Sequence, residues 1–330
     1  MKVTIIDDYQ RAFENSPAIR RLKQKAEVQI CTEKFGSEEA LVRALKGSQA
    51  IVPMRERTRF PAHLLKSLPD LEVIAQTGNH AYHIDIEAAT ETGILVALAP
   101  GGSGVTELTI GLMIDVMRQV SYSDRQMRRG EWPLVLGAVL KNKTLGILGL
   151  GKVGVEIARI ARAFQMKVIA WGPTLTQERA EKSQATYMAL EEVLKNADVV
   201  SVHLKLSEQS KGLLNEPRLR LMKKSAYFIN TARGAIVDEN ALAKLLEENA
   251  IAGAALDVFV EEPLPADSRL LKLENVVLAP HLGWPTDDGF RGFAETAVEN
   301  ILDYMEGKLT RAINPEALEK RKNRLVSRSP

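Results

Sequence analysis

The side chains best suited to acid–base chemistry follow strands expected in the second half of the chain. They are a guanidinium, a carboxylate and an imidazole: Arg233, Glu261 or Glu262, and His281. In open α/β sheets, ligands bind beyond the carboxyl ends of the strands, so these loops are expected to border one crevice. A histidine can exchange a proton near neutral pH, and a neighbouring carboxylate favours its charged form. An arginine stays charged and can bind a carboxylate through two hydrogen bonds.

A glycine-rich segment at 144–154 precedes this set. It has the pattern of a buried strand, a turn and the start of a helix, which is how a dinucleotide-binding βαβ unit begins. Gly149 would allow the tight turn, Gly151 the close approach of a pyrophosphate, and Gly154 tight packing of the helix on the strand. The pyrophosphate would lie at the helix N-terminus, where free N–H groups and the helix dipole favour an anion.

Together with a nicotinamide, these side chains suit the reversible reduction of a 2-keto acid. Hydride would go to C2, and His281 would give a proton to the carbonyl oxygen. Arg233 would hold the substrate carboxylate and polarise the carbonyl oxygen. We therefore expect an oxidoreductase that acts on a small molecule.

Composition excludes several other classes. The 330 residues carry a net charge of +2, from 44 basic and 42 acidic residues, which gives no general attraction for nucleic acid. No apolar stretch approaches the roughly 18 residues that span a bilayer, and the N-terminus does not resemble a signal peptide. Cys31 is the single cysteine, so no disulfide forms within the chain, and no metal site is indicated. We expect a cytoplasmic protein with neither nucleic acid nor membrane as partner.

Strand and helix patterns alternate along the chain, which predicts α/β architecture with parallel sheets. The expected strands are 3–7, 27–31, 50–53, 72–76 and 94–96 in the first third, then 144–148, 167–171, 198–202, 226–230, 253–257 and 275–279. A Pro/Gly cluster at 99–104 is the best hinge candidate, and helices are expected at 105–120 and 287–307. The prediction is two doubly wound, Rossmann or flavodoxin-like domains with a cleft between them: a discontinuous substrate-binding (catalytic) domain, 1–101 and 287–330, and a dinucleotide-binding Rossmann domain, 102–286.

Four segments together resemble the D-2-hydroxyacid dehydrogenase family. They are GLGKVG at 149–154, NTARGAIVD at 230–238, ALDVFVEEP at 255–263 and PHLG at 280–283. The resemblance implies an NAD(P)-dependent D-2-hydroxyacid dehydrogenase, or 2-ketoacid reductase, that acts on CH–OH donors. It also implies a homodimer formed through the nucleotide-binding domains.

The resemblance also assigns site residues. Arg233, Glu262 and His281 would be catalytic, and Glu262 is chosen over Glu261 because the family's acid directly precedes the proline. The residues expected to bind the cofactor are Gly149, Gly151, Lys152, Val153, Gly154, Gly172, Thr231, Ala232, Asp257 and Gly283. Those expected to bind substrate are Arg55, Gly78, Asn79 and Trp284. Backbone N–H groups around Gly78 and Asn79 would hold the substrate carboxylate, and Asp257 would contact the nicotinamide amide.

Several of these positions leave alternatives open. Arg55 would either reach substrate or belong to a solvated charged loop, and Trp284 would line the pocket for an apolar keto acid or close it. Gly172 stands where the family commonly has an aspartate that bonds the adenosine ribose and repels a 2′-phosphate. NAD is therefore favoured, but NADP is possible. The alternative functions are an NAD(H)-sensing or corepressor-like binding protein on the same fold, and phosphite-type oxidation.

Overall fold

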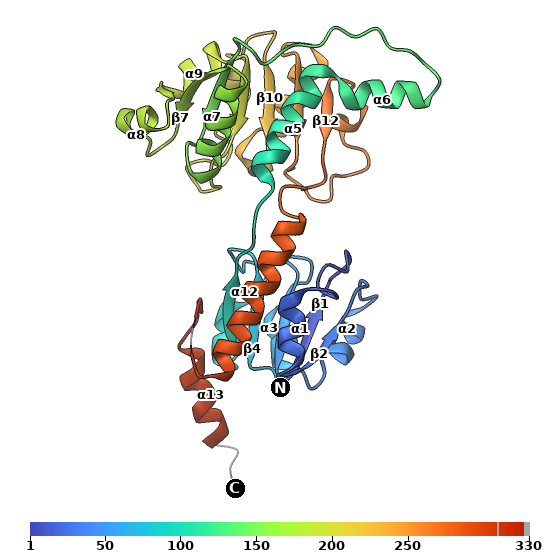
Figure 1. Cartoon of the computed structure of the whole chain (residues 1–330), viewed down its shortest axis with the longest axis vertical. Coiled ribbons are helices and arrows are strands. Elements are labelled where there is room, and N and C mark those ends of the chain that lie inside the picture. Colours follow the sequence, from blue (N-terminus) through green and yellow to red (C-terminus); the bar gives the residue numbers. More distant parts are fainter. Residues whose placement is uncertain (309, 327–330) are drawn as a thin grey trace. The chain divides into compact units, whose positions relative to one another are not determined.

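The structure, a computed structural model, describes residues 1–308 and 310–326, apart from the side chains of 322–326. The chain forms two compact units, each an α/β sandwich (Figure 1). Unit 1 comprises Met1–Ser103 and Pro285–Pro330, and unit 2 comprises Gly104–Trp284. Two parallel-sheet α/β units of this kind confirm the predicted fold class.

Unit 1 contains a parallel sheet in the order β2-β1-β3-β4-β5. Its strands are β1 (Lys2–Ile6), β2 (Glu27–Ile30), β3 (Ala50–Pro53), β4 (Val73–Thr77) and β5 (Leu95–Ala99). Every residue of β3 and β4 is buried, as expected where helices cover both faces of a parallel sheet. The helices are α1 (Pro17–Lys23), α2 (Glu38–Leu45), α3 (Ala62–Lys66), α4 (Ile86–Glu91), α12 (Asp287–Met305) and α13 (Ala317–Val326).

Helix α12 returns the chain to unit 1 and packs on β4, β5 and α1. The hydroxyl of Thr286 caps its N-terminus by accepting the N–H of Gly289 at 3.0 Å. A Cβ on Gly292 would lie 2.8 Å from the Cα of Gly101, so the end of the first segment and α12 approach closely. These contacts explain why a unit that is split in the sequence is continuous in space.

Unit 2 contains a parallel sheet in the order β12-β11-β10-β9-β6-β7-β8. Its strands are β6 (Thr144–Leu148), β7 (Lys167–Trp171), β8 (Thr186–Tyr187), β9 (Val199–Val202), β10 (Tyr227–Asn230), β11 (Gly253–Leu256) and β12 (Val276–Leu278). The helices are α5 (Val105–Arg118), α6 (Val120–Arg128), α7 (Lys152–Ala163), α8 (Gln177–Lys182), α9 (Leu190–Asn196), α10 (Glu216–Leu219) and α11 (Glu239–Glu247). The strand order reverses between β6 and β9, which is where a doubly wound sheet binds its ligand.

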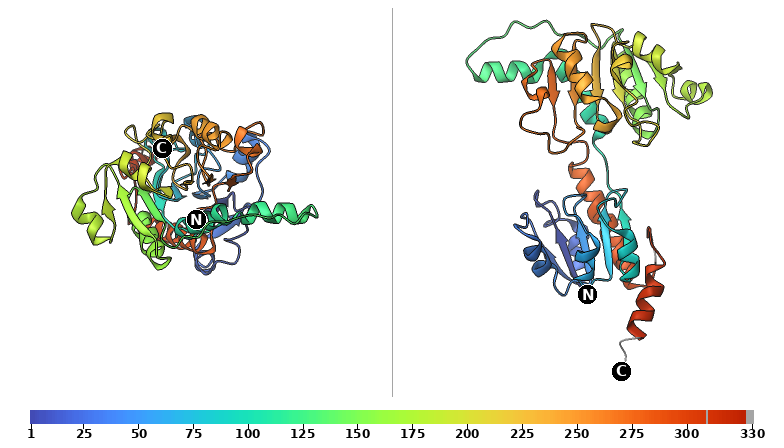
Figure 2. Two further views of the ribbon diagram at one scale, coloured as in Figure 1. Left: turned by 90° about the horizontal axis from the view of Figure 1, so that it is seen from above. Right: turned by 180° about the vertical axis from the view of Figure 1, so that it is seen from behind.

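The helix expected at 105–120 is shorter than predicted. It ends at Arg118 because Gln119 adopts a left-handed conformation with φ of 55°. The carboxylate of Asp115 then accepts the N–H of Ser121 at 2.7 Å and starts α6, a helix that the sequence analysis missed. Figure 2 shows α6 and the loop after it extending away from the body of unit 2. Within the described residues, none of the helices combines the length and the apolarity needed to cross a bilayer.

Candidate active site

Each glycine of the turn after β6 meets a different geometric requirement. Gly149 has φ of +104°, and a Cβ there would lie 2.7 Å from the carbonyl oxygen of His203, so this position requires glycine. A Cβ on Gly154 would collide with the carbonyl oxygen of Gly149, which shows how closely α7 packs on the turn. A Cβ on Gly151 would instead point into open space. The turn thus has the room that a closely bound pyrophosphate requires.

Helix α7 begins at this turn. Gly151 is its N-cap and offers no side chain to the first N–H groups, and the first turn contains no acidic residue. The N–H groups of the first turn, including those of Lys152 and Val153, therefore favour an external anion. These features fit the pyrophosphate of a dinucleotide.

His281 and Glu262 form a hydrogen-bonded pair after β12 and β11. Nδ1 of His281 lies 2.7 Å from Oε2 of Glu262, whose Oε1 accepts the N–H of Phe259 at 3.0 Å. Burial raises the pKa of Glu262, but these two hydrogen bonds and the charges of His281 and Arg233 outweigh it, so the pKa lies below its ordinary value. The ionised carboxylate can hold a proton on Nδ1 and leave Nε2 to exchange one.

Arg233 lies on the loop after β10 with its side chain exposed. The side-chain amide of Asn230 holds this loop through two hydrogen bonds. It donates to the carbonyl oxygen of Arg233 at 3.1 Å and accepts the N–H of Ala232 at 3.0 Å. A Cβ on Gly234 would collide with the backbone of Phe259, so the loops after β10 and β11 pack tightly together. The structure therefore brings the arginine loop to the carboxylate loop, and Asn230 has a positioning role that the sequence analysis missed.

Asp257 follows β11 and is only 1% exposed. Its carboxylate accepts the N–H groups of Leu282 at 2.6 Å and Gly283 at 3.0 Å, and its carbonyl oxygen accepts the N–H of His281 at 3.0 Å. Burial raises the pKa of Asp257, although the two backbone hydrogen bonds oppose this. Asp257 thus fixes the turn that presents His281. Both carboxylate oxygens of Asp257 already accept a backbone N–H, so a nicotinamide amide that contacts Asp257 would bind an oxygen that is also bonded to Leu282 or Gly283.

Two further side chains, those of Thr231 and His203, follow strands at the same edge of the sheet. Thr231 is buried, and its hydroxyl lies 2.8 Å from that of Thr109 on α5, so it anchors the start of the arginine loop. His203 follows β9 and is bonded through Nε2 to Ser201 at 2.7 Å. Burial lowers the pKa of His203 to about 3, so its imidazole is neutral and structural.

Gly172 lies on the loop after β7, directly beside the glycine turn. The N–H of Gly149 donates to the carbonyl oxygen of Trp171 at 2.7 Å. A Cβ on Gly172 would come no closer than 3.4 Å to its surroundings, so a side chain would fit there. Arg179 folds back to this loop and donates through Nη1 to the carbonyl oxygen of Thr174 at 2.8 Å. The loop therefore carries a guanidinium and lacks the expected carboxylate.

In unit 1, Arg55 is a fixed, largely buried cation and not a solvated charge. Its backbone is left-handed, with φ of 59°, and is held by two side chains of β4. Its N–H donates to the hydroxyl of Thr77 at 2.7 Å, and its carbonyl oxygen accepts from Gln76 at 3.1 Å. The side chain is 13% exposed and lies against Gly78, where a Cβ would collide with Nη1.

The loop after β4 offers fewer donors than predicted. The N–H of Gly78 already donates to the carbonyl oxygen of Ala99 at 2.7 Å. Gly78 therefore acts mainly by allowing the close approach of Arg55, and Asn79 is left as the predicted amide donor. Trp284, the last residue of unit 2, is partly buried.

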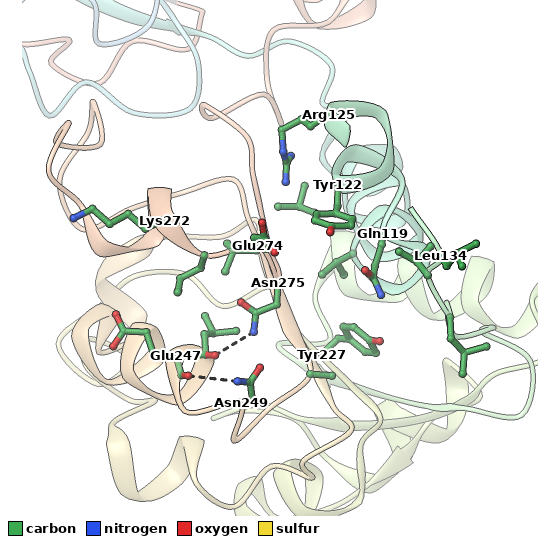
Figure 3. A pocket seen from close by; sticks show the side chains of 18 residues that line it. Gln119, Tyr122, Arg125, Leu134, Tyr227, Glu247, Asn249, Lys272, Glu274 and Asn275 are labelled. Atoms are coloured by element: carbon green, nitrogen blue, oxygen red, sulfur yellow. Dashed lines mark hydrogen bonds between the residues drawn. The ribbon is translucent and has the colours of Figure 1, made fainter. Parts of the chain in front are cut away.

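A cavity of about 570 Å³ lies elsewhere in unit 2 (Figure 3). Tyr122 and Arg125 of α6 line it together with Asn249 and Asn275, near the amino-terminal ends of β10, β11 and β12. The candidate catalytic loops leave these strands at their opposite, carboxyl ends. The cavity is therefore separate from the candidate active site.

Comparison with known proteins agrees with this arrangement. Residues 110–283 match the model for the NAD binding domain of the D-isomer specific 2-hydroxyacid dehydrogenases. The glyoxylate reductase of Thermofilum pendens is 36% identical over 322 residues, covering 92% of this chain and 93% of that protein. The D-3-phosphoglycerate dehydrogenase of Rattus norvegicus is 36% identical over 307 residues, but this chain spans only 57% of its length.

A solved structure of a phosphoglycerate oxidoreductase from Vibrio cholerae aligns with a TM-score of 0.84 and 33% identity, covering 93% of this chain and 99% of that one. The sequence relatives and the fold thus point to the same family along nearly the whole chain. The chain therefore belongs to the D-isomer specific 2-hydroxyacid dehydrogenase family, whose members are nicotinamide-dependent oxidoreductases of hydroxy and keto acids.

Proposed function

We propose that the protein transfers a hydride between NAD(P)H and a 2-keto acid, or in reverse between a D-2-hydroxy acid and NAD(P)⁺. The observation that carries this proposal is the 2.7 Å pair of His281 and Glu262, on the same edge of the sheet as the glycine turn. An oriented imidazole beside a dinucleotide site is suited to moving one proton for each hydride.

The cofactor, when bound, supplies or takes up the hydride. As C2 of the keto acid becomes tetrahedral, Nε2 of His281 gives its proton to the carbonyl oxygen, and in the reverse direction it takes the hydroxyl proton. Glu262 remains ionised, holds Nδ1–H and stabilises the charged ring. Arg233 binds the substrate carboxylate and polarises the carbonyl oxygen.

Substrate contacts are proposed from Arg55, Gly78 and Asn79, and Trp284 is proposed to border the pocket. Support for Arg55 comes from its left-handed backbone and its burial, because strained residues concentrate at functional sites. For Gly78, the proposed role is limited to accommodating Arg55, since its N–H is already bonded.

The cofactor is proposed to be NAD, with NADP also accepted. Gly172 provides no carboxylate to repel a 2′-phosphate, and Arg179 is held on the same loop by its bond to Thr174. Lys152 and Val153 would contact the pyrophosphate, and Thr231, Ala232, Asp257 and Gly283 would border the nicotinamide half.

A homodimer is also proposed. The loop after α6 exposes five large apolar side chains, of which Trp132 at 79%, Leu134 at 94% and Leu136 at 95% are the most exposed. Apolar side chains grouped on one projecting segment are typical of a surface that another chain covers. This arm, defined as residues 119–139, supports the dimer that the family resemblance implies.

The proposed reaction is tested by combining each of a panel of 2-keto acids with NADH and with NADPH. Turnover is measured as the oxidation of the reduced nicotinamide. Glyoxylate, pyruvate, hydroxypyruvate, phenylpyruvate and branched-chain keto acids cover the size range. His281→Ala should abolish turnover while cofactor binding, measured by fluorescence, is retained. Tight cofactor binding by the unaltered protein without turnover of any acid would instead favour a nucleotide-sensing binding protein.

A further inference from the structure

The carboxyl edge of the unit 1 sheet holds a chain of polar contacts that the proposed reaction does not use. Oε1 of Glu56 lies 2.8 Å from Nε2 of His80 and 3.3 Å from Nη2 of Arg55. The ring of His80 also stacks on Tyr82, with centroids 4.5 Å apart and planes 15° apart. Oε1 of Glu56 therefore contacts both the imidazole of His80 and the guanidinium of Arg55. The imidazole is held in turn by Glu56 and by the ring of Tyr82.

These contacts fix the direction of the Arg55 guanidinium. Nη1 lies against Gly78, and Nη2 faces Glu56. The backbone of Arg55 is fixed by Gln76 and Thr77, and Glu56 adds a charged contact at the guanidinium itself. Glu56 thus has the position of a supporting residue, which sets the geometry of Arg55, the residue proposed to touch substrate.

Glu56 also places a permanent negative charge beside Arg55. Burial raises the pKa of Glu56, but the hydrogen bond from His80 and the charge of Arg55 outweigh it and lower the pKa to about 2. Its side chain is 40% exposed, so the carboxylate can be approached from solvent.

The neighbouring Arg57 is directed to other partners. It donates to the carbonyl oxygen of Asp7 at 2.6 Å and to Gln10 at 2.9 Å, and its guanidinium lies 4.6 Å from the centre of the Tyr9 ring. Asp7 itself is buried. The charge of Arg57 is therefore directed to the residues that follow β1, and not to the surroundings of Arg55.

We propose that Glu56, held in place by His80, determines substrate specificity by aiming Arg55 at the substrate carboxylate and by repelling a second anionic group. The inference rests on the proposed function and names its substrate class: 2-keto acids with a single negative charge, such as glyoxylate, pyruvate or hydroxypyruvate. Keto acids with a phosphate or a second carboxylate bring that extra charge toward the Glu56 carboxylate, where like charges repel.

The test compares kcat/KM for glyoxylate and hydroxypyruvate with kcat/KM for oxaloacetate and phosphohydroxypyruvate, at saturating reduced cofactor. The unaltered protein should favour the singly charged acids at least tenfold. Glu56→Gln keeps the shape but removes the charge, and it should reduce that preference at least tenfold, through a lower KM for the doubly charged acids. His80→Gln can still donate to Glu56 and should keep the preference, whereas His80→Phe cannot and should weaken it.

A matched control exists in the same unit. Glu38 accepts from His63 at 3.0 Å on the exposed surface, so Glu38→Gln removes the same charge from the same kind of pair. This variant should leave the preference unchanged. The cofactor dissociation constant should be the same in Glu56→Gln and Glu38→Gln.

Three outcomes would overturn the inference: a native preference for doubly charged acids, an equal loss of kcat/KM for both classes in Glu56→Gln, or the same shift in Glu38→Gln. Each of these leaves the keto-acid reductase activity standing. Absence of turnover with every acid and both cofactors would instead reject the proposed function, and the specificity assignment with it.

Discussion

The carboxylate of Glu262 binds Nδ1 of His281 through one oxygen, at 2.7 Å, and the N–H of Phe259 through the other, at 3.0 Å. Because both oxygens are bonded, the carboxylate group cannot rotate freely. The backbone N–H of Phe259 therefore helps to set the direction of the His281 imidazole. This relationship makes the protonation state of one carboxylate a condition for the geometry of the histidine that is proposed to be catalytic.

Glu262→Gln should lower kcat by roughly 10²- to 10⁴-fold, because the amide no longer stabilises the charged ring. The pKa of Glu262 lies below its ordinary value, so the stabilisation that it gives is present above that ordinary value and is lost as the pH falls through the lowered pKa. The melting temperatures of the native protein and Glu262→Gln should therefore differ near neutral pH and converge in acid. A difference that persists unchanged in acid would contradict this role of the charge.

The glycines of the turn should separate folding from cofactor binding. Gly154→Ala places a methyl group against the carbonyl oxygen of Gly149 and should lower the free energy of unfolding by about 1–3 kcal/mol. Gly151→Ala meets open space, so it should change stability by less than about 1 kcal/mol. It should nevertheless weaken NADH binding by roughly tenfold or more, equivalent to about 1.4 kcal/mol. Denaturant unfolding and fluorescence titration measure the two effects, and equal behaviour of the two variants would refute the assignment.

The loop after β7 should control the choice between NADH and NADPH. Gly172→Asp restores the carboxylate that bonds a ribose diol, and it should lower the kcat/KM ratio of NADPH to NADH by roughly tenfold or more. Arg179→Ala should weaken NADPH binding and leave NADH binding nearly unchanged. Arg159, which pairs with Glu156 on the surface of α7, supplies the control as Arg159→Ala. Equal effects of the two arginine variants would show that only overall charge matters.

The arm should determine the oligomeric state. Replacing Leu134 and Leu136 together by Asp puts two charges on a surface proposed to be buried between subunits, and it should convert a dimer to a monomer. Ile313→Asp, at an exposed apolar side chain of unit 1, should leave the dimer intact. Light scattering coupled to size-exclusion chromatography measures the mass. A monomeric native protein, or an unchanged dimer in the double variant, would exclude this interface.

The sequence predicts the two α/β sheets because their strands are buried on both faces and bounded by glycines and polar residues. It does not reveal β8, a strand of only two exposed residues, or α6, which begins after the left-handed Gln119. The two residues of β8 are too few to show a hydrophobic period, and the start of α6 depends on the conformation of Gln119 and on the bond from Ser121 to Asp115.

The candidate site shows the same division. Arg233, Glu262 and His281 can be found from their positions after strands and from the resemblance. Asp257, Asn230 and Glu56 support other residues through specific hydrogen bonds or ion pairs, and a sequence does not show which side chains meet in such contacts. The family resemblance predicts an amide donor to substrate at Gly78, but its N–H is bonded to the carbonyl oxygen of Ala99, a contact that depends on the packing of β5.

Two residues proposed to touch substrate, Arg55 and His281, have left-handed backbones, with φ of 59° and 55°. Such a conformation costs a residue with a side chain about 1–3 kcal/mol, which glycine would largely avoid. The protein thus gives up thermodynamic stability at the positions where it holds a guanidinium and an imidazole. Arg55→Gly would relieve this strain only by removing a largely buried side chain and its ion pair with Glu56, so the strained backbone and the guanidinium are kept or lost together.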